Sequence, residues 1–345
     1  MAEYISFQPT DFFNPKLYTG TGSSLGVTGV GFQPDLTWIK QRNSTGNHYI
    51  ADAARGAGKY VEASTNIAQV DNINGLSAFD ADGFTVGTQG SQVNGSSDTY
   101  VSWNWKAGTT SGLTGGTITP SSYSINTTSG CGIYKYAGNS TSGATIAHGL
   151  GVAPSTIWIK NLDITDDWQI YHVGMGNTKY LEFNTSDAAG TATNRWNDTS
   201  PTSTVFSLGN YGGVNTGSDY VAYAFADVRG YSRMGVYTGN GNADGTFVYL
   251  GFRPAFLIVK EQGGTNNWTM FDNKRNPFWN PTAEALQPNS SAGEYDETDG
   301  VDFLSNGFKT REAAAWLNSD GQPILYIAFA AFPIVSSNDV PVVAR

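Results

Sequence analysis

The chain is poor in charged residues and in cysteine. Only 14% of its 345 residues are Asp, Glu, Lys or Arg, against about 25% in an average globular protein. The formal charge is −10 and no run of Lys or Arg occurs, so phosphate backbones and anionic lipids should repel the chain. The single cysteine, Cys131, excludes an intrachain disulfide. We therefore expect no nucleic-acid partner and folding without an oxidising compartment.

Long apolar segments are absent as well. No window approaches the roughly 18 consecutive apolar residues that a membrane-spanning helix needs. The first six residues have neither the basic start nor the apolar core of a secretory signal. We therefore expect no membrane insertion, and synthesis in a bacterial cytoplasm without secretion.

The missing charge is replaced by small polar residues and by aromatics. The chain has 42 glycines and 13% aromatic residues. Strands joined by turns suit a surface of Ser, Thr, Asn and Gly, whereas helices favour Glu, Lys, Arg and Ala on their wet faces. The composition predicts an all-β fold with little helix.

One strand pattern occurs three times. The segments are GFQPDLTWIK at 31–40, GVAPSTIWIK at 151–160 and GFRPAFLIVK at 251–260, so the proline and the lysine recur at offsets of 120 and 100. Proline lacks a backbone donor and is tolerated at the first residues of a strand. The end of each segment is apolar at successive positions, which predicts a central strand covered on both faces.

Four further elements accompany each copy of this pattern, in the same order. They are a Tyr-x-Gly turn, an alternating strand, a strand with Phe and an aromatic closing strand. The turns begin at Tyr18, Tyr136 and Tyr237; the alternating strands are 48–52, 168–172 and 268–272; the Phe strands are 83–87, 205–209 and 307–309; the closing strands are 100–105, 220–225 and 326–331. The offsets of 120 and 100 residues between copies suit a whole β-sandwich module better than a short solenoid coil. They predict three tandem β-sandwich, jelly-roll-like repeats.

The repeat sets the expected boundaries. The first β-sandwich repeat covers residues 1–108, the second 123–229 and the third 230–333. Residues 109–122 are rich in Gly and Thr and are expected to form a linker. Residues 334–345 are expected to form a C-terminal tail.

The sequence contains no recognisable metal or cofactor motif. The three histidines, His48, His148 and His172, share no ligand spacing. Residues 80–83 read DADG, which resembles the start of a calcium loop but does not complete its pattern; a turn before a strand is favoured. We therefore expect no cofactor, no metal site and no catalytic residues.

Two Asp and Arg pairs hold the same offset in the first and third units. Asp52 and Arg55 correspond to Asp272 and Arg275, whereas the second unit has His172 and Met175 there. The favoured interpretation is a local salt bridge that fixes a turn. A carboxylate clamp for a sugar and an ion pair between subunits are the alternatives.

The repeat also sorts the tryptophans. Those in repeated positions are expected in the core: Trp38, Trp103, Trp158, Trp168 and Trp268. Trp196, Trp279 and Trp316 lie in segments that do not repeat. Exposed aromatic rings offer a flat apolar face to a sugar and also anchor protein interfaces, so these three are candidate contacts for a glycan or a partner.

The repeat strings resemble a family of virion proteins from phages that infect cyanobacteria and other marine bacteria, whose members are often labelled tail fibre proteins. The resemblance covers nearly the whole chain. It is closest in GVYTGNG at 235–241, GFRPAF at 251–256, FDNKRNP at 271–277, DFLSNGFK at 302–309 and the ending VPVVAR at 340–345. The chain leaves no room for the trimerising stem of a fibre shaft. No active-site residue carries over from this family.

The resemblance implies a non-enzymatic virion structural protein, such as a tail fibre, tail appendage or adhesin that contacts host-surface carbohydrate. Its other partners would be virion proteins and its own copies, in a homotrimer, and it would leave the host by lysis. Three alternatives stay open: a capsid decoration (head appendage) protein, an envelope-polysaccharide depolymerase, and a lectin-like adhesin unrelated to phage. The sequence names neither the receptor nor the host.

Overall fold

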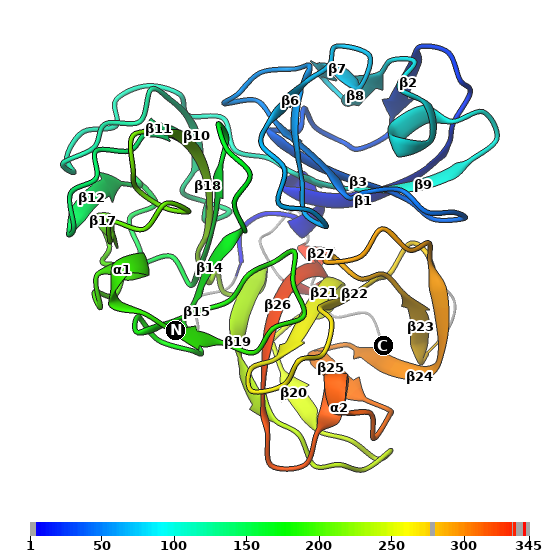
Figure 1. Ribbon diagram of the computed structural model, residues 1–345. Helices are drawn as coiled ribbons and strands as arrows, with labels where there is room; N and C mark the ends of the chain where they lie inside the picture. Colours follow the sequence, from blue (N-terminus) through cyan, green and yellow to red (C-terminus); the bar gives the residue numbers. More distant parts are fainter. Residues whose placement is uncertain (1–4, 277–279, 333, 336–340, 343–345) are drawn as a thin grey trace.

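The computed structural model describes residues 5–276, 280–332, 334–335 and 341–342. Within these ranges the chain is all-β, as the composition predicts, with several antiparallel sheets and only short helical turns. Figure 1 shows three β-rich units arranged around a shared centre. No helix in the described part of the chain is long and apolar enough to cross a membrane.

The three units have similar element orders. Unit one consists of η1 (Pro9–Asp11), β1 (Phe13–Thr19), β2 (Leu25–Thr28), β3 (Leu36–Gln41), β4 (Tyr49–Asp52), β5 (Lys59–Glu62), β6 (Val70–Asp71), β7 (Leu76–Asp80), β8 (Gly83–Val86), η2 (Gly90–Asn94) and β9 (Thr99–Trp105). Unit two consists of β10 (Ser122–Asn126), β11 (Cys131–Ala137), β12 (Ala144–Ala147), β13 (Thr156–Asn161), β14 (Gln169–His172), β15 (Lys179–Tyr180), β16 (Gly190–Thr191), α1 (Thr193–Trp196), β17 (Val205–Leu208) and β18 (Asp219–Phe225). Unit three consists of β19 (Ser232–Thr238), β20 (Phe247–Tyr249), β21 (Arg253–Glu261), β22 (Thr269–Asp272), β23 (Thr282–Ala285), β24 (Tyr295–Leu304), β25 (Gly307–Thr310), α2 (Ala315–Asn318) and β26 (Pro323–Phe332).

Each unit contains a main sheet, and four strands in each main sheet have equivalent positions: β1-β9-β3-β4, β11-β18-β13-β14 and β19-β26-β21-β22. Units one and two add further strands at an edge. The full orders are β1-β9-β3-β4-β5-β6, β10-β11-β18-β13-β14 and β19-β26-β21-β22. The registers also correspond: Trp38 lies opposite Trp103, Trp158 opposite Tyr223 and Ile258 opposite Ile327. In each unit the closing aromatic strand is therefore paired with the strand that follows the repeated proline. The three main sheets therefore share this pairing, while the triplication itself stays a prediction from the sequence.

A second sheet lies on one face of each main sheet. These outer sheets have the orders β2-β8-β7, β12-β17 and β20-β25-β24-β23. The space between the two sheets of a unit is filled by its own apolar cluster: Ile39 packs with Phe84 in unit one, Ile159 with Phe206 in unit two, and Val259 with Phe308 in unit three.

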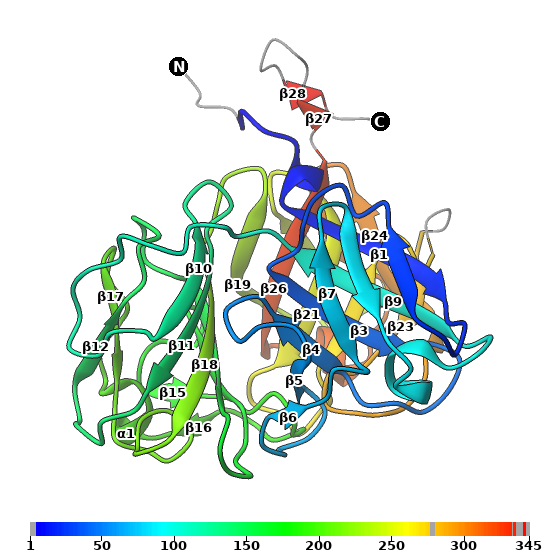
Figure 2. The same ribbon diagram turned by 90° about the horizontal axis from the view of Figure 1, so that it is seen from above.

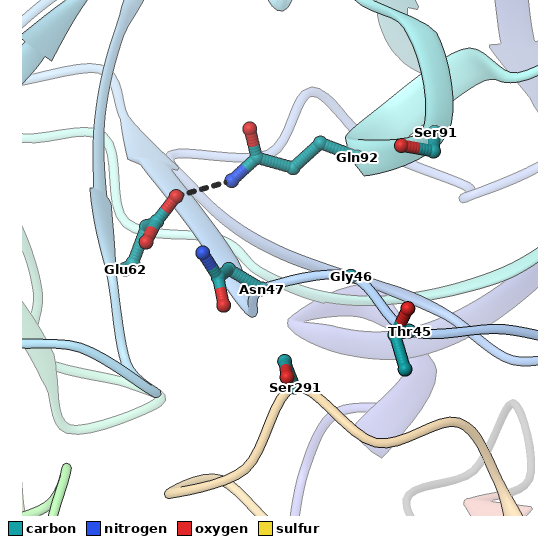
Figure 3. A pocket seen from close by; sticks show the side chains of 7 residues that line it. All are labelled: Thr45, Gly46, Asn47, Glu62, Ser91, Gln92 and Ser291. Atoms are coloured by element: carbon teal, nitrogen blue, oxygen red, sulfur yellow. Dashed lines mark hydrogen bonds between the residues drawn. The ribbon is translucent and has the colours of Figure 1, made fainter.

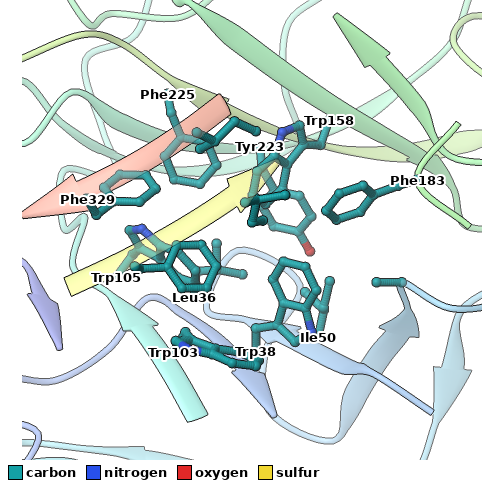
Figure 4. Packing of buried hydrophobic residues seen from close by; sticks show 14 of the residues in the cluster. Leu36, Trp38, Ile50, Trp103, Trp105, Trp158, Phe183, Tyr223, Phe225 and Phe329 are labelled. Carbon is teal, nitrogen blue, oxygen red and sulfur yellow. The ribbon is translucent and has the colours of Figure 1, made fainter. Parts of the chain in front are cut away.

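The opposite faces of the three main sheets meet in one central aromatic core. Trp38, Trp103 and Trp105 of unit one, Trp158 and Phe225 of unit two, and Phe256 and Phe329 of unit three all belong to it (Figure 4). The Trp105 ring lies 5.9 Å from that of Phe225 and 5.5 Å from that of Phe329, measured between centroids. The main strands are thus covered on both faces, as predicted.

The range predicted as a linker is part of unit two. Thr109 forms a bridge with Ile125, and Gly116 and Ile118 form bridges with Ile146 on the edge strand β12. Ile118 is buried and Leu113 packs against the core of unit two. The Gly- and Thr-rich composition of residues 109–122 predicted a linker. The free edge of β12 instead supplies hydrogen-bond partners that order this segment.

Both ends of the described chain leave the body on one side. Figure 2 shows the N-terminal segment and the short hairpin of β27 (Ile334–Val335) and β28 (Pro341–Val342) on the same end of the molecule. Within the predicted tail, residues 336–340 and 343–345 lie outside the described residues. β6 and β16 lie near the opposite end (Figure 2).

Candidate functional site

The lysine that ends each repeated segment is buried at a junction between units. Lys40 Nζ donates to the Ser291 carbonyl of unit three at 3.3 Å, Lys160 Nζ to the Asn66 carbonyl of unit one at 3.1 Å, and Lys260 Nζ to the Ser186 carbonyl of unit two at 3.1 Å. Each ammonium also donates to carbonyls of its own unit. Unit one thus reaches unit three, unit two reaches unit one, and unit three reaches unit two.

Burial changes the titration of these lysines. In all three, desolvation lowers the pKa from its usual 10.5 to about 8. Because the charged form is disfavoured in the fold, the unfolded chain holds more protons between about pH 8 and 10.5. The cost of burying each ammonium is therefore present below pH 8 and is relieved as the pH rises. These lysines contribute to the junctions rather than to a surface.

Main-chain hydrogen bonds connect the same three pairs of units, with the donor and acceptor units reversed. The Gln69 N–H donates to the Leu162 carbonyl, the Ala189 N–H to the Gln262 carbonyl, and the Glu294 N–H to the Arg42 carbonyl, at 2.7–2.9 Å. Beside them, the Trp168 indole N–H donates to the Glu62 carbonyl and the Trp268 indole N–H to the Glu182 carbonyl. The units therefore form a closed ring within one chain.

Asp52 and Arg55 form an ion pair at a junction. Arg55 Nε lies 2.6 Å from Asp52 Oδ2 and both side chains are fully buried. The Tyr223 hydroxyl of unit two donates to the same oxygen at 2.7 Å. Tyr223 and the desolvated Asp52 carboxylate offset the cost of burying the guanidinium, and the pKa of Arg55 is raised.

Asp272 and Arg275 repeat this arrangement between units three and one. Arg275 Nε lies 2.5 Å from Asp272 Oδ2, and both side chains are fully buried. The Trp103 indole N–H of unit one donates to Asp272 Oδ2 at 3.1 Å. The favoured interpretation of a local salt bridge thus describes both pairs, and each also bonds to the next unit. With no exposed surface on their side chains, they do not form a carboxylate clamp for a sugar.

The corresponding position in unit two is a neutral histidine. His172 Nε2 lies 3.1 Å from the Tyr326 carbonyl of unit three, and its Nδ1 accepts from the Gly174 N–H at 3.0 Å. These partners fix the proton on Nε2. Desolvation lowers the pKa of His172 to about 4. All three junctions therefore use the same position with different chemistry.

The tryptophans proposed as ligand contacts lie in different surroundings. Trp196 is buried in the core of unit two, and its indole N–H donates to the Lys179 carbonyl at 3.0 Å. It has no ring face available to a sugar, which corrects the expectation. Trp316 is half-buried and stacks on Phe271 with 6.1 Å between ring centroids. Trp279 lies outside the described residues.

The DADG segment forms the predicted turn. Asp80 pairs with Gly83 across the β7–β8 hairpin. Both carboxylate oxygens of Asp82 accept backbone N–H groups, from Gly29 at 2.9 Å and Gly31 at 2.7 Å. These hydrogen bonds lower the pKa of Asp82. Among the described residues no group of three or more His, Cys, Asp or Glu is placed to hold a metal ion.

An open polar pocket lies where unit one meets unit three. It has a volume of about 330 Å³ and is lined by Thr45, Gly46, Asn47, Glu62, Ser91, Gln92 and Ser291 (Figure 3). Glu62 is only 4% exposed. Its Oε1 accepts from Gln92 Nε2 at 2.6 Å and its Oε2 from the Thr65 hydroxyl at 2.9 Å. No sequence pattern predicted this pocket, because its residues come from four separate segments.

Two exposed aromatic residues also escaped prediction. Phe247 and Tyr249 on the edge strand β20 are 46% and 58% exposed. Arg233 lies over the Tyr249 ring, 5.9 Å from its centroid. Successive side chains of a strand point to opposite faces of the sheet. Because Val248 is buried, Phe247 and Tyr249 on either side of it point outward, and this alternation could have predicted their exposure.

The fold and its junctions define a chain of three β-sandwich units closed into a ring around an aromatic core. The chain belongs to the family described as a domain of unknown function (DUF7483), whose family model matches residues 8–333. No curated protein and no solved structure is significantly similar to it.

Proposed function

We propose that the chain is a non-enzymatic structural protein of a bacteriophage particle, a tail appendage or adhesin that contacts host-surface glycan. The observation that carries the proposal is the use of the recurring polar residues. The repeated lysines are buried and donate to backbone carbonyls of the neighbouring unit. The two Asp–Arg pairs are also buried, and each carboxylate accepts a hydrogen bond from an aromatic side chain of the neighbouring unit. The recurrence of these residues within the chain is explained by a rigid scaffold, and the resemblance to marine phage virion proteins supplies the context.

The acidic clusters also have structural partners, which weakens the depolymerase alternative. Asp166 Oδ1 accepts from the Asp167 N–H at 2.9 Å, Asp167 Oδ1 accepts from Asn184, and Glu294 pairs with Arg42 and Arg275. Glycoside cleavage uses two carboxylates about 5–9 Å apart that both reach the substrate. Among the residues that line the polar pocket, Glu62 is the one carboxylate.

Capsid decoration is the second candidate, and the cyclic order of the junctions favours it. A protein with three similar units around one axis is suited to a threefold position of a lattice. Both ends of the described chain lie on one side, which would leave the other side facing outward.

The test is quantitative mass spectrometry of purified particles of the virus that encodes the chain. A few tens of copies or fewer per particle would support a tail appendage, and hundreds would support decoration. Absence from the particle would refute the proposal. In parallel, purified chain is incubated with host envelope; release of new reducing ends would establish the depolymerase instead.

A further inference from the structure

We propose that the open polar pocket between units one and three binds one uncharged or amine-bearing sugar residue, with the Glu62 carboxylate as its central acceptor. The inference rests on the proposed glycan contact and gives it a location and a substrate class. It moves the contact from the tryptophans, where the sequence placed it, to a site built from loops of two units.

The position of the pocket suits contact with a surface. The loop after β3, the end of β5 and the π-helical turn η2 provide its walls in unit one, and Ser291 closes it from unit three. These elements lie on the end of the molecule away from the two termini (Figure 2). The pocket therefore lies away from the side on which both ends of the described chain leave the body.

The lining supplies the hydrogen-bonding groups that a sugar needs. Hydroxyls come from Thr45, Ser91 and Ser291, and amides from Asn47 and Gln92 (Figure 3). An ionised carboxylate can accept about four hydrogen bonds, and Glu62 accepts one on each oxygen, from Gln92 and from Thr65. Its remaining acceptor capacity can meet hydroxyl or ammonium donors. The volume is at the lower end of small-molecule sites, which begin at about 300 Å³, and matches one sugar ring.

The charge of the pocket selects among sugars. Glu62 is the one ionisable group in the lining, and it lies in a nearly buried position where like charges repel strongly. Uronic acids and sugar phosphates are therefore disfavoured, whereas an amino sugar gains an ion pair.

Unit two has an equivalent carboxylate that does not line the pocket. Glu182 corresponds to Glu62, since each follows a Lys-Tyr strand and each carbonyl accepts a Trp indole N–H from the next unit. There Gln169 donates to Glu182, and Arg195 donates to Gln169. The Arg195 guanidinium lies 4.3 Å from the Tyr180 centroid and 3.2 Å from the Tyr211 centroid. Glu182 is thus held by a side chain of its own unit and lies outside the pocket lining, so it serves as the matched control for Glu62.

The local backbone is a second indication. Gly90–Asn94 is a π-helical turn, a rare conformation that is found often at functional sites. It carries Ser91 and Gln92 to the rim of the pocket, and Gln92 is held by Gln89 at 2.6 Å and by Glu62. The acceptor is thus presented in one orientation before a ligand arrives.

The experiment is a saturation-transfer NMR titration of the full-length chain with glucose, galactose, N-acetylglucosamine, glucosamine, galacturonic acid and glucose 6-phosphate. We expect saturable binding of at least one neutral or amino sugar and none of the two anionic probes. Glu62→Gln should weaken that binding at least fivefold, and Glu182→Gln should leave it unchanged. Ser291→Tyr, at an exposed position, should abolish it by filling the pocket.

Binding of none of the neutral and amino sugars would overturn the inference. Equal binding by wild type and Glu62→Gln would also overturn it, provided that Glu62→Gln melts at the wild-type temperature. If the chain is found in particles and yet binds none of these sugars, the pocket assignment fails while the proposed function stands.

Discussion

Single residues show why the Tyr-x-Gly turn recurs. The Tyr18, Tyr136 and Tyr237 hydroxyls each donate to a backbone carbonyl within their own unit. A side chain on the glycine two positions later would clash with backbone: the ideal Cβ of Gly20 would lie 2.2 Å from a carbonyl oxygen, that of Gly138 2.0 Å and that of Gly239 2.1 Å. The turn therefore excludes every other residue at this position.

His172 should make the fold sensitive to acid. Its pKa is about 4 in the fold and near 6.5 when unfolded, so the unfolded chain binds more protons between these values. The stability that this group contributes is present above pH 6.5 and is lost as the pH falls toward 4, by about 3 kcal/mol at most. We predict that His172→Gln loses less stability than wild type between pH 7 and 4, measured by urea unfolding.

Comparison of the two proteins is necessary because burial also lowers the pKa of His48 and His148, and these act in the same direction. An identical pH dependence in variant and wild type would show that His172 does not titrate as the structure indicates.

The burial of a residue could be predicted where its position recurs in the three units. It could not be predicted for residues in segments that occur in one unit alone. Trp38, Trp158 and Trp268 are each 1% exposed, as their repeated positions predicted. Trp196 was assigned to the surface because its segment does not repeat, yet it is also 1% exposed. The short helix α1 turns its ring inward against Tyr171. Lack of repetition shows only that a residue is particular to one unit, and says nothing about exposure.

At the scale of elements, periodicity predicted the strands but not the junctions between units. The central strands β3, β13 and β21 fall on the three segments that carry the repeated pattern. The partners of Lys40, Lys160 and Lys260 are loop carbonyls, and a carbonyl is common to every residue type. No side-chain pattern could therefore identify them. The pocket was missed for the same reason, since it depends on how two units meet.

The Asp272–Arg275 pair tests the junction between β22 and β9. Arg275→Leu leaves the Asp272 carboxylate buried with the Trp103 indole N–H but no cation. Breaking a buried ion pair from one side costs about 3–5 kcal/mol, so we expect a loss of this size in the free energy of unfolding. The measurement is urea denaturation followed by tryptophan fluorescence.

The double variant Asp272→Leu/Arg275→Leu is the matched control. It removes both charges, and we expect it to recover at least half of the lost stability. A single variant as stable as wild type would mean that the pair contributes nothing to the junction.

At the scale of the whole molecule, the ring bears on the number of chains. A homotrimer is the expectation drawn from the threefold symmetry common in phage appendages. The ring provides three units around one core within a single chain. We therefore predict that light scattering at micromolar concentration gives the mass of one chain, 36.8 kDa. Three times that mass would favour the homotrimer.

The shared aromatic core has a consequence for how the chain tolerates breakage. The contacts that close the ring are hydrogen bonds, ion pairs and ring contacts between units, so they do not depend on peptide continuity. A cut between residues 229 and 230 would leave one fragment with units one and two and another with unit three. Each fragment would expose the apolar faces of main sheets that face the shared core. Such fragments should find each other when mixed and rebuild the native arrangement, whereas either one alone should aggregate.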